Sequence, residues 1–127
     1  MKPNGLLLIV FSVVAAATSV AMLFAPRFYF FVYGASADAQ ATLLLRYVGA
    51  LFGGLAVMAW MGRIAEATQS RAMVLGLAVL SGLGAVVTAS MALTGHYNVV
   101  VWISVAIQAA FFAGFVLVAR AGILPKQ

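Results

Sequence analysis

Four long apolar runs constrain this chain more than any other feature of its sequence. They cover residues 5–25, 41–62, 72–94 and 98–119, so each is 21 to 23 residues long. About 20 apolar residues in a helix cross the hydrocarbon layer of a bilayer, where backbone groups must find their hydrogen-bond partners within the protein. We therefore expect an all-α fold, in which residues 1–127 form a single four-helix transmembrane bundle.

The composition indicates that lipid is the main surrounding medium. Hydrophobic residues make up 66% of the chain and charged residues 7%, whereas soluble domains are about half apolar and about a quarter charged. The net charge of +5 comes from residues that flank the apolar runs, which argues against a nucleic-acid partner. The chain has no cysteine, which excludes disulfides and cysteine-ligated metals. The expected partner is the lipid bilayer.

The loops between the runs set the topology. Residues 63–71 and 95–97 are short connections, which favours antiparallel neighbours and hence two sequential hairpins. Most basic residues fall on one side of the membrane: Lys2, Arg63, Arg71, Arg120 and Lys126. Arg27 falls on the other side. Because positive charge is retained on the cytoplasmic side, we expect one fixed orientation with both termini in the cytoplasm.

The first run also has features of a secretory signal peptide. Lys2 gives it a charged start, and Ser19-Val20-Ala21 resembles a small-residue cleavage site. Apolar sequence continues beyond this point to Pro26. We therefore expect the segment to be retained as the first membrane helix.

Residues 26–34 are too aromatic for a solvated loop and too short to cross a bilayer. Phe28 and Phe31 fall on one helical face, and the hydroxyls of Tyr29 and Tyr33 are expected to reach headgroups or water. We interpret this segment as part of an interfacial girdle, with a binding lid as the alternative. The predicted interfacial anchors are Phe28, Tyr29, Phe31, Tyr33, Trp60 and Trp102.

Small residues at helical spacing predict how the helices pack. Gly49 and Gly53 form a GxxxG element, and Ala106, Ala110 and Gly114 form a second ridge. Burying leucine against leucine gains little in lipid, so close approach through small residues must supply the contact. We expect these residues to pack helices within one chain. A membrane-protein partner or a homo-oligomer is the alternative.

Few polar groups are available for a function. Arg46 is the one charge within a predicted span, and an intramembrane charge needs a partner or water. It either fixes the outer loop, for example by pairing with Asp38, or lines a vestibule for an anionic headgroup or small acid. The candidate polar or ligand-binding cluster consists of Arg46, Asp38, Gln40, Ser90, Tyr97 and Asn98.

Gln108 lies close to the midpoint of the fourth run. An amide at this position predicts an interhelical hydrogen bond to Ser12, Ser81 or a free backbone carbonyl. His96 is the one histidine, and no second histidine or carboxylate motif completes a metal or haem site around it. The two acids, Asp38 and Glu66, fall on opposite sides of the membrane, so no catalytic triad is formed. We expect neither an enzyme nor a bound metal or cofactor.

Three segments of the chain carry a likeness to a known group of proteins: residues 43–53, Gly62-Arg63 and residues 94–98. Over residues 40–120 the chain resembles small uncharacterised four-helix bacterial inner-membrane proteins. The resemblance implies a membrane bundle in the bacterial inner membrane and names no activity.

These patterns favour a noncatalytic membrane protein that serves as an accessory subunit or small scaffold and associates through its glycine-rich helix faces. The alternative is a binding or transport module for a lipid, a quinone or another amphipathic small molecule, at an outer-leaflet site near Arg46.

Overall fold

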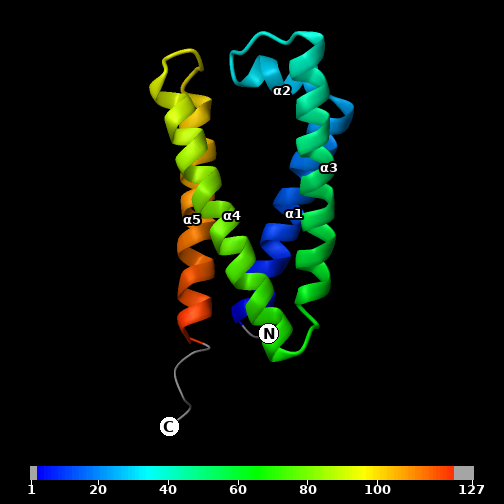
Figure 1. Cartoon of the computed structure of the whole chain (residues 1–127), viewed down its shortest axis with the longest axis vertical. Coiled ribbons are helices and arrows are strands. Elements are labelled where there is room, and N and C mark those ends of the chain that lie inside the picture. Colours follow the sequence, from blue (N-terminus) through cyan, green and yellow to red (C-terminus); the bar gives the residue numbers. More distant parts are fainter. Residues whose placement is uncertain (1–2, 122–127) are drawn as a thin grey trace.

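A computed structural model describes residues 3–121 and contains within them five helices and no β-strand (Figure 1). Four helices are long and one is short. They are α1 (Pro3–Phe24), α2 (Pro26–Val32), α3 (Ala39–Gly62), α4 (Ala67–Leu93) and α5 (Val100–Ala121). The all-α prediction is confirmed.

The four long helices match the four apolar runs, and each is long and apolar enough to cross a membrane. The protein is thus a multi-pass membrane protein. The main difference is at α4, which begins at Ala67 although its apolar run begins at residue 72. Its first turn is polar, and a membrane helix continues beyond the apolar layer because its backbone hydrogen bonds remain favourable in water. The middle loop is correspondingly short.

The helices pair as two hairpins, α1 with α3 and α4 with α5. Figure 1 shows these pairs as two arms that converge where α1 begins and diverge towards α2. We call these two ends of the bundle the terminal end and the α2 end. The predicted arrangement of sequential antiparallel hairpins is confirmed, and contacts between the two arms are far fewer than those within each arm.

Small residues bring α1 and α3 together. A Cβ atom placed on Gly49 would lie 2.8 Å from the Cβ of Met22, and one on Gly53 would lie 3.0 Å from the Oγ of Ser19. One turn after Gly53 on α3, the carbonyl of Ala56 accepts a 2.7 Å hydrogen bond from the Ser12 hydroxyl of α1. The GxxxG element therefore packs within the chain, as expected.

A compact apolar cluster joins the arms. Phe11 on α1 packs edge-on against Phe111 and Phe115 of α5, with ring centroids 5.1 and 5.4 Å apart. Phe115 is fully buried, and Val74 of α4 and Leu8 of α1 belong to the same cluster. Edge-to-face pairs contribute about 0.5–1.5 kcal/mol beyond their buried area, so the aromatic residues give this junction a specific geometry.

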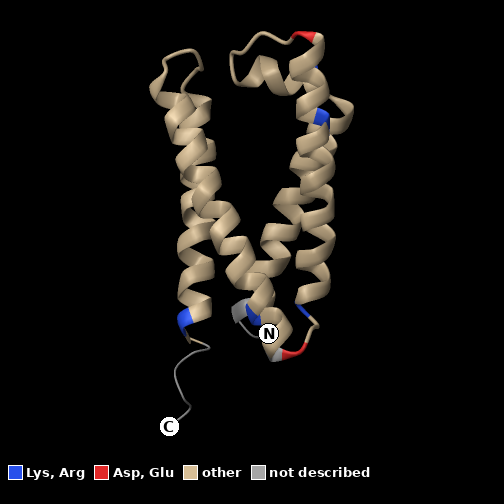
Figure 2. Cartoon of the chain, viewed as in Figure 1, with Lys and Arg blue, Asp and Glu red and all other residues tan. Residues whose placement is uncertain are grey.

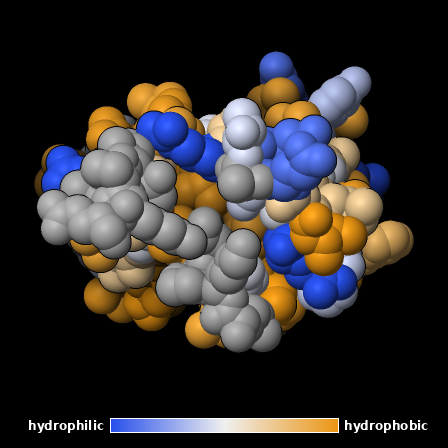
Figure 3. Space-filling model, turned by 90° about the horizontal axis from the view of Figure 1, so that it is seen from below, coloured by the Kyte–Doolittle hydropathy of each residue, from blue (hydrophilic) through white to orange (hydrophobic). Residues whose placement is uncertain are grey.

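Charged side chains lie near the two ends of the bundle. Figure 2 shows charged residues at the end of α5 and around the α3–α4 loop at the terminal end, and others near the α2 end. Arg120 lies in the last turn of α5, and Asp38 caps the start of α3. Figure 3 views the terminal end and shows hydrophilic side chains on it, with hydrophobic side chains along much of the rim. Lys2 and Lys126, which contribute to the predicted orientation, lie outside the described residues.

Candidate functional site

Gln108 makes the interhelical hydrogen bond that its position predicts, but with a different partner. Its Nε2 donates a 3.0 Å hydrogen bond to the Oγ1 of Thr88 on α4, and Thr88 in turn donates to the carbonyl of Gly84. The proposed partners Ser12 and Ser81 were wrong, because Ser12 bonds to α3 and Gln108 faces the α4 side of its own hairpin. The contact joins α4 to α5.

The three residues of the second small-residue ridge, all on α5, have different surroundings. A Cβ atom on Gly114 would lie 3.3 Å from a methyl carbon of Leu7 on α1, so this residue packs where the arms converge. Ala106 and Ala110 are exposed. The prediction that this ridge packs within the chain therefore holds for Gly114 and is wrong for Ala106 and Ala110, because their side of α5 is not covered by another helix.

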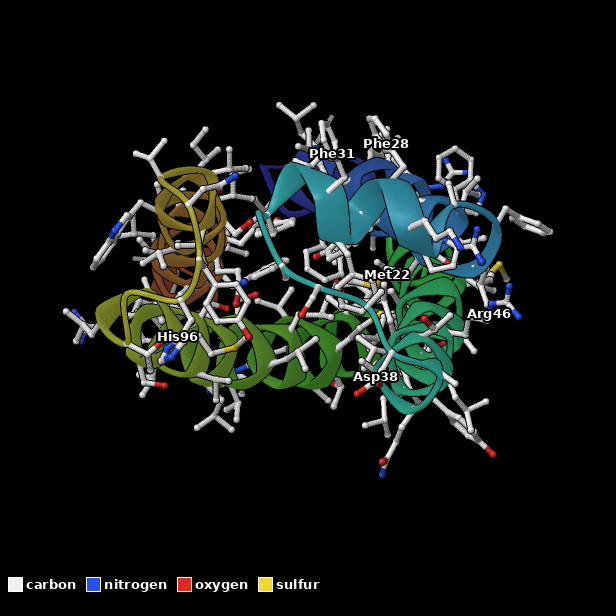
Figure 4. All side chains as sticks on the ribbon, turned by 90° about the horizontal axis from the view of Figure 1, so that it is seen from above. Met22, Phe28, Phe31, Asp38, Arg46 and His96 are labelled. Atoms are coloured by element: carbon white, nitrogen blue, oxygen red, sulfur yellow. The ribbon has the colours of Figure 1, made fainter. Side chains whose placement is uncertain are left out.

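The short helix α2 presents its phenylalanines outwards. Phe28 and Phe31 are 64% and 78% exposed, and Figure 4 shows both pointing away from the bundle. This agrees with an interfacial position. Trp60 and Trp102, the predicted anchors on α3 and α5, are also exposed, and the Arg63 guanidinium lies 3.9 Å from the centroid of the Trp60 ring.

The two tyrosines of α2 were wrongly assigned to headgroups. Tyr29 and Tyr33 are half-buried and stack on each other with ring centroids 4.8 Å apart. The Tyr33 hydroxyl forms a hydrogen bond with the hydroxyl of Ser104 on α5. Burial raises the pKa of the Tyr29 hydroxyl well above its usual value, and its hydrogen bond and charge interaction with Tyr33 act in the same direction. Helical spacing separated the tyrosines from the phenylalanines but did not show which face turns inwards.

Asn98 fastens the α4–α5 loop to α2. Its Nδ2 donates a 2.8 Å hydrogen bond to the carbonyl of Val32, and its backbone N–H donates to the carbonyl of Tyr33. Its Oδ1 accepts a 3.0 Å hydrogen bond from the N–H of Val100 at the start of α5. Gly34 adopts a φ of 68° and leaves room for the Asn98 side chain. This latch joins the two arms at the α2 end.

The predicted polar cluster is divided between the two arms. Ser90 donates to the carbonyl of Val87 in its own helix, Asn98 belongs to the latch, and Tyr97 is half-buried beside it in the chain. Gln40 is exposed in the first turn of α3. Only Asp38 and Arg46 line a common cavity.

This cavity has a volume of about 610 Å³ and lies where α1, α2 and α3 meet, within the range of about 300–1,000 Å³ typical of small-molecule sites. It is lined by Phe24, Ala25, Pro26, Arg27, Ala37, Asp38, Ala39, Thr42 and Arg46. Arg27 was missed as a site residue because it had been interpreted only as a topology signal. Its position directly after Pro26, which opens α2, is the feature that places it beside the start of α3.

Asp38 is positioned by the helix that it caps. Its Oδ1 accepts a 2.6 Å hydrogen bond from the N–H of Ala41, and its carbonyl accepts one from the Thr42 hydroxyl. Within the part of the chain that the structure describes, no acidic side chain lies within 4.0 Å of a basic nitrogen. Asp38 is thus not held by Arg46, so the predicted pairing of these two residues is not formed.

Arg46 faces outwards. It lies seven residues after the start of α3 and is exposed, and Figure 4 shows its side chain pointing away from α4 and α5. The cavity it lines with Arg27 is therefore on the side of the bundle, next to exposed Phe24. Two guanidinium groups and one carboxylate beside apolar walls can bind a charged group of an amphipathic molecule.

Comparison with known proteins finds no matching family model, no matching curated protein and no matching solved structure. The resemblance to small bacterial inner-membrane proteins therefore stays a prediction. Function must be argued from the geometry of the α2 end.

Proposed function

We propose that this protein is a noncatalytic membrane protein that binds an amphipathic small molecule, through an anionic group of that molecule, in the cavity at Arg46. The observation that carries the proposal is the cavity of about 610 Å³ that brings Arg27, Asp38 and Arg46 together from two helices and the loop between them. Arginine forms paired hydrogen bonds with phosphate or carboxylate. The two basic groups outnumber the single acid, so the cavity can hold an anionic group of a ligand.

The apolar side of the cavity supports an amphipathic ligand. Phe24 and Pro26 contribute to its lining, and Phe24 is 81% exposed. Phe28, in the short helix α2 that follows, is also exposed. A ligand with its charged group on the arginines has an apolar surface next to it for a hydrocarbon part.

The charge distribution suggests on which side of the membrane this site lies. The positive-inside rule puts the α2 end on the outer side, so the proposed ligand is held in the outer leaflet. The resemblance to bacterial inner-membrane proteins suggests the cytoplasmic membrane of a bacterium as the location. Both points extend the proposal; the first depends on the predicted orientation and the second on the resemblance.

The contacts give less support to association with a partner through the glycine-rich faces than to ligand binding. The Gly49 and Gly53 face is covered by Met22 and Ser19 of α1, so a partner would have to displace α1. A scaffold or accessory role that used this face would break the packing of its own hairpin. The ligand-binding function is therefore the one that the geometry supports best.

Native mass spectrometry of the protein purified in mild detergent tests this proposal. We expect the wild type to carry a bound lipid-sized adduct, and Arg46→Gln to lose most of it. Arg63→Gln is the matched control. Arg63 is also an exposed arginine, but it packs over the Trp60 ring near the other end of α3. An adduct of equal occupancy on all three proteins, or on none, would contradict the proposal.

A further inference from the structure

The cavity at Arg46 contains charges of both signs that do not neutralise each other. Arg27 and Arg46 contribute positive charge and Asp38 negative charge, and none of the three forms an ion pair with another described residue within 4.0 Å. All three are exposed. Each therefore keeps hydrogen-bonding capacity for a ligand.

We propose that the cavity selects a zwitterionic phospholipid headgroup in which a phosphate is followed by a primary ammonium group. Arg27 and Arg46 bind the phosphate and Asp38 binds the ammonium. This inference rests on the proposed function and specifies its ligand class. The same chemistry is present in free phosphoethanolamine, so the experiment below includes both sources.

The phosphate assignment follows from the two arginines. A guanidinium group presents planar, paired N–H donors that match phosphate oxygens. Arg27 comes from the first turn of α2 and Arg46 from the second turn of α3, so the two groups approach the cavity from different helices. A phosphate between them accepts from both.

The ammonium assignment follows from Asp38. Its Oδ1 caps α3 through the Ala41 N–H, whereas no described donor bonds to its Oδ2. Asparagine caps a helix about as well as aspartate, so capping alone requires no charge here. Next to a purely anionic headgroup this carboxylate is repulsive, whereas a primary ammonium donates to it in a charge-assisted hydrogen bond.

The surroundings of the cavity favour a lipid over a soluble molecule. Arg46 points outwards, away from α4 and α5, and Phe24, which lines the same cavity, is 81% exposed. In a multi-pass protein this lateral surface faces lipid. A headgroup entering from the side of the bundle leaves its acyl chains next to Phe24 and Pro26 of the lining.

Lipid titrations of the delipidated full-length protein, followed by native mass spectrometry, test the inference. The probes are phosphatidylethanolamine, which has both charges, and phosphatidylglycerol, which lacks the ammonium. We expect the wild type to bind phosphatidylethanolamine roughly tenfold more tightly than phosphatidylglycerol, the effect of one charge-assisted hydrogen bond. Asp38→Asn keeps the helix cap and is expected to remove this preference. Arg46→Gln is expected to weaken the binding of both lipids.

Glu66→Gln is the matched control, because Glu66 is the other acid of the chain and lies before α4, near the opposite end of the bundle. It is expected to keep the wild-type preference. A preference that survives Asp38→Asn overturns the inference, as does equal binding of the two lipids by the wild type. If both lipids bind equally but Arg46→Gln weakens them, the proposed function stands without its headgroup selectivity. If neither lipid binds, both fail.

A competition experiment with soluble phosphoethanolamine distinguishes a lipid headgroup from the free molecule as the ligand. We expect the free molecule not to displace phosphatidylethanolamine at equal concentration, because it lacks the acyl chains that would lie against Phe24. Displacement at equal concentration would overturn the assignment to a lipid.

Discussion

The Gln108 side chain of α5 occupies the space that Gly84 of α4 leaves open. A Cβ atom on Gly84 would overlap the Gln108 amide oxygen, and in this position the Gln108 amide nitrogen bonds to Thr88. The two residues depend on each other, because a side chain at position 84 would exclude the amide. This relationship fixes how α4 and α5 pack in the arm that does not contain the cavity.

Gly84→Ala is expected to destabilise the protein by about 1 kcal/mol, the value of an interhelical hydrogen bond in a membrane. The added methyl group displaces the Gln108 amide and breaks its bond to Thr88. Thermal unfolding in detergent measures the loss. Gly76→Ala is the control in the same helix, because nothing lies within 4 Å of a Cβ there. A loss equal to that of Gly76→Ala would rule out the hydrogen bond as the cause.

Gly49→Ala is expected to cost about 1–3 kcal/mol through overpacking. The new methyl group would lie 2.8 Å from the Met22 Cβ and 3.3 Å from the Ser19 carbonyl oxygen, and these atoms cannot move without moving α1. Gly54→Ala, whose Cβ would have no neighbour within 4 Å, controls for helix propensity. Unfolding in detergent should separate the two variants, and similar melting temperatures would show that α1 does not cover Gly49.

Asn98→Asp is expected to loosen the α2 end of the bundle. It keeps an acceptor for the Val100 N–H but removes the Nδ2 donor that bonds to the Val32 carbonyl. Spin labels at exposed positions 40 and 96, one on each arm, should show a broader and longer distance distribution by electron paramagnetic resonance. Ser90→Ala, which affects a bond within α4, should leave the distribution unchanged. An unchanged distribution in Asn98→Asp would mean that the latch does not hold the arms.

Tyr29 is expected to ionise only above pH 10, since burial and its neighbour Tyr33 raise its pKa above the ordinary tyrosine value of 10.0. The protonated form is the favoured one in the fold. This contribution to stability is therefore fully present below pH 10 and is lost as the pH rises through the folded pKa. The difference in tyrosinate absorbance between wild type and Tyr29→Phe, followed against pH, gives the ionisation of this residue. A midpoint at or below pH 10 would contradict a buried Tyr29.

Much of the fold can be predicted from the sequence because membrane insertion depends on local properties. Length and apolarity identify α1, α3, α4 and α5, and the short connections predict which neighbours pair. The spacing of Gly49 and Gly53 likewise predicted a close helix contact. The start of α4 at Ala67 was not predicted, because a polar first turn carries no apolar signal.

The candidate functional site was only partly predictable. Arg46 and Asp38 were identified as candidates, since charge and amide groups are scarce in an apolar chain. Ser90 was wrongly grouped with the others, because position along an apolar run does not say on which arm a residue lies. Arg27 was missed because its charge was interpreted only as a topology signal. The inward direction of Tyr29 and Tyr33 was missed because helical spacing does not say which face of α2 turns towards the bundle.

The sequence by itself determined the four long apolar helices and their pairing as two hairpins, because these follow from the number of apolar residues that a bilayer requires and from the short connections between the runs. Only the tertiary structure decided that Gln108 meets Thr88, that Asn98 fastens the loop to α2, and that Arg27 joins Arg46 around one cavity. Lipid surrounds every helix with a nearly uniform apolar solvent. Which faces meet is therefore decided by shape and hydrogen bonding between helices, and hydrophobic patterning carries little information about it.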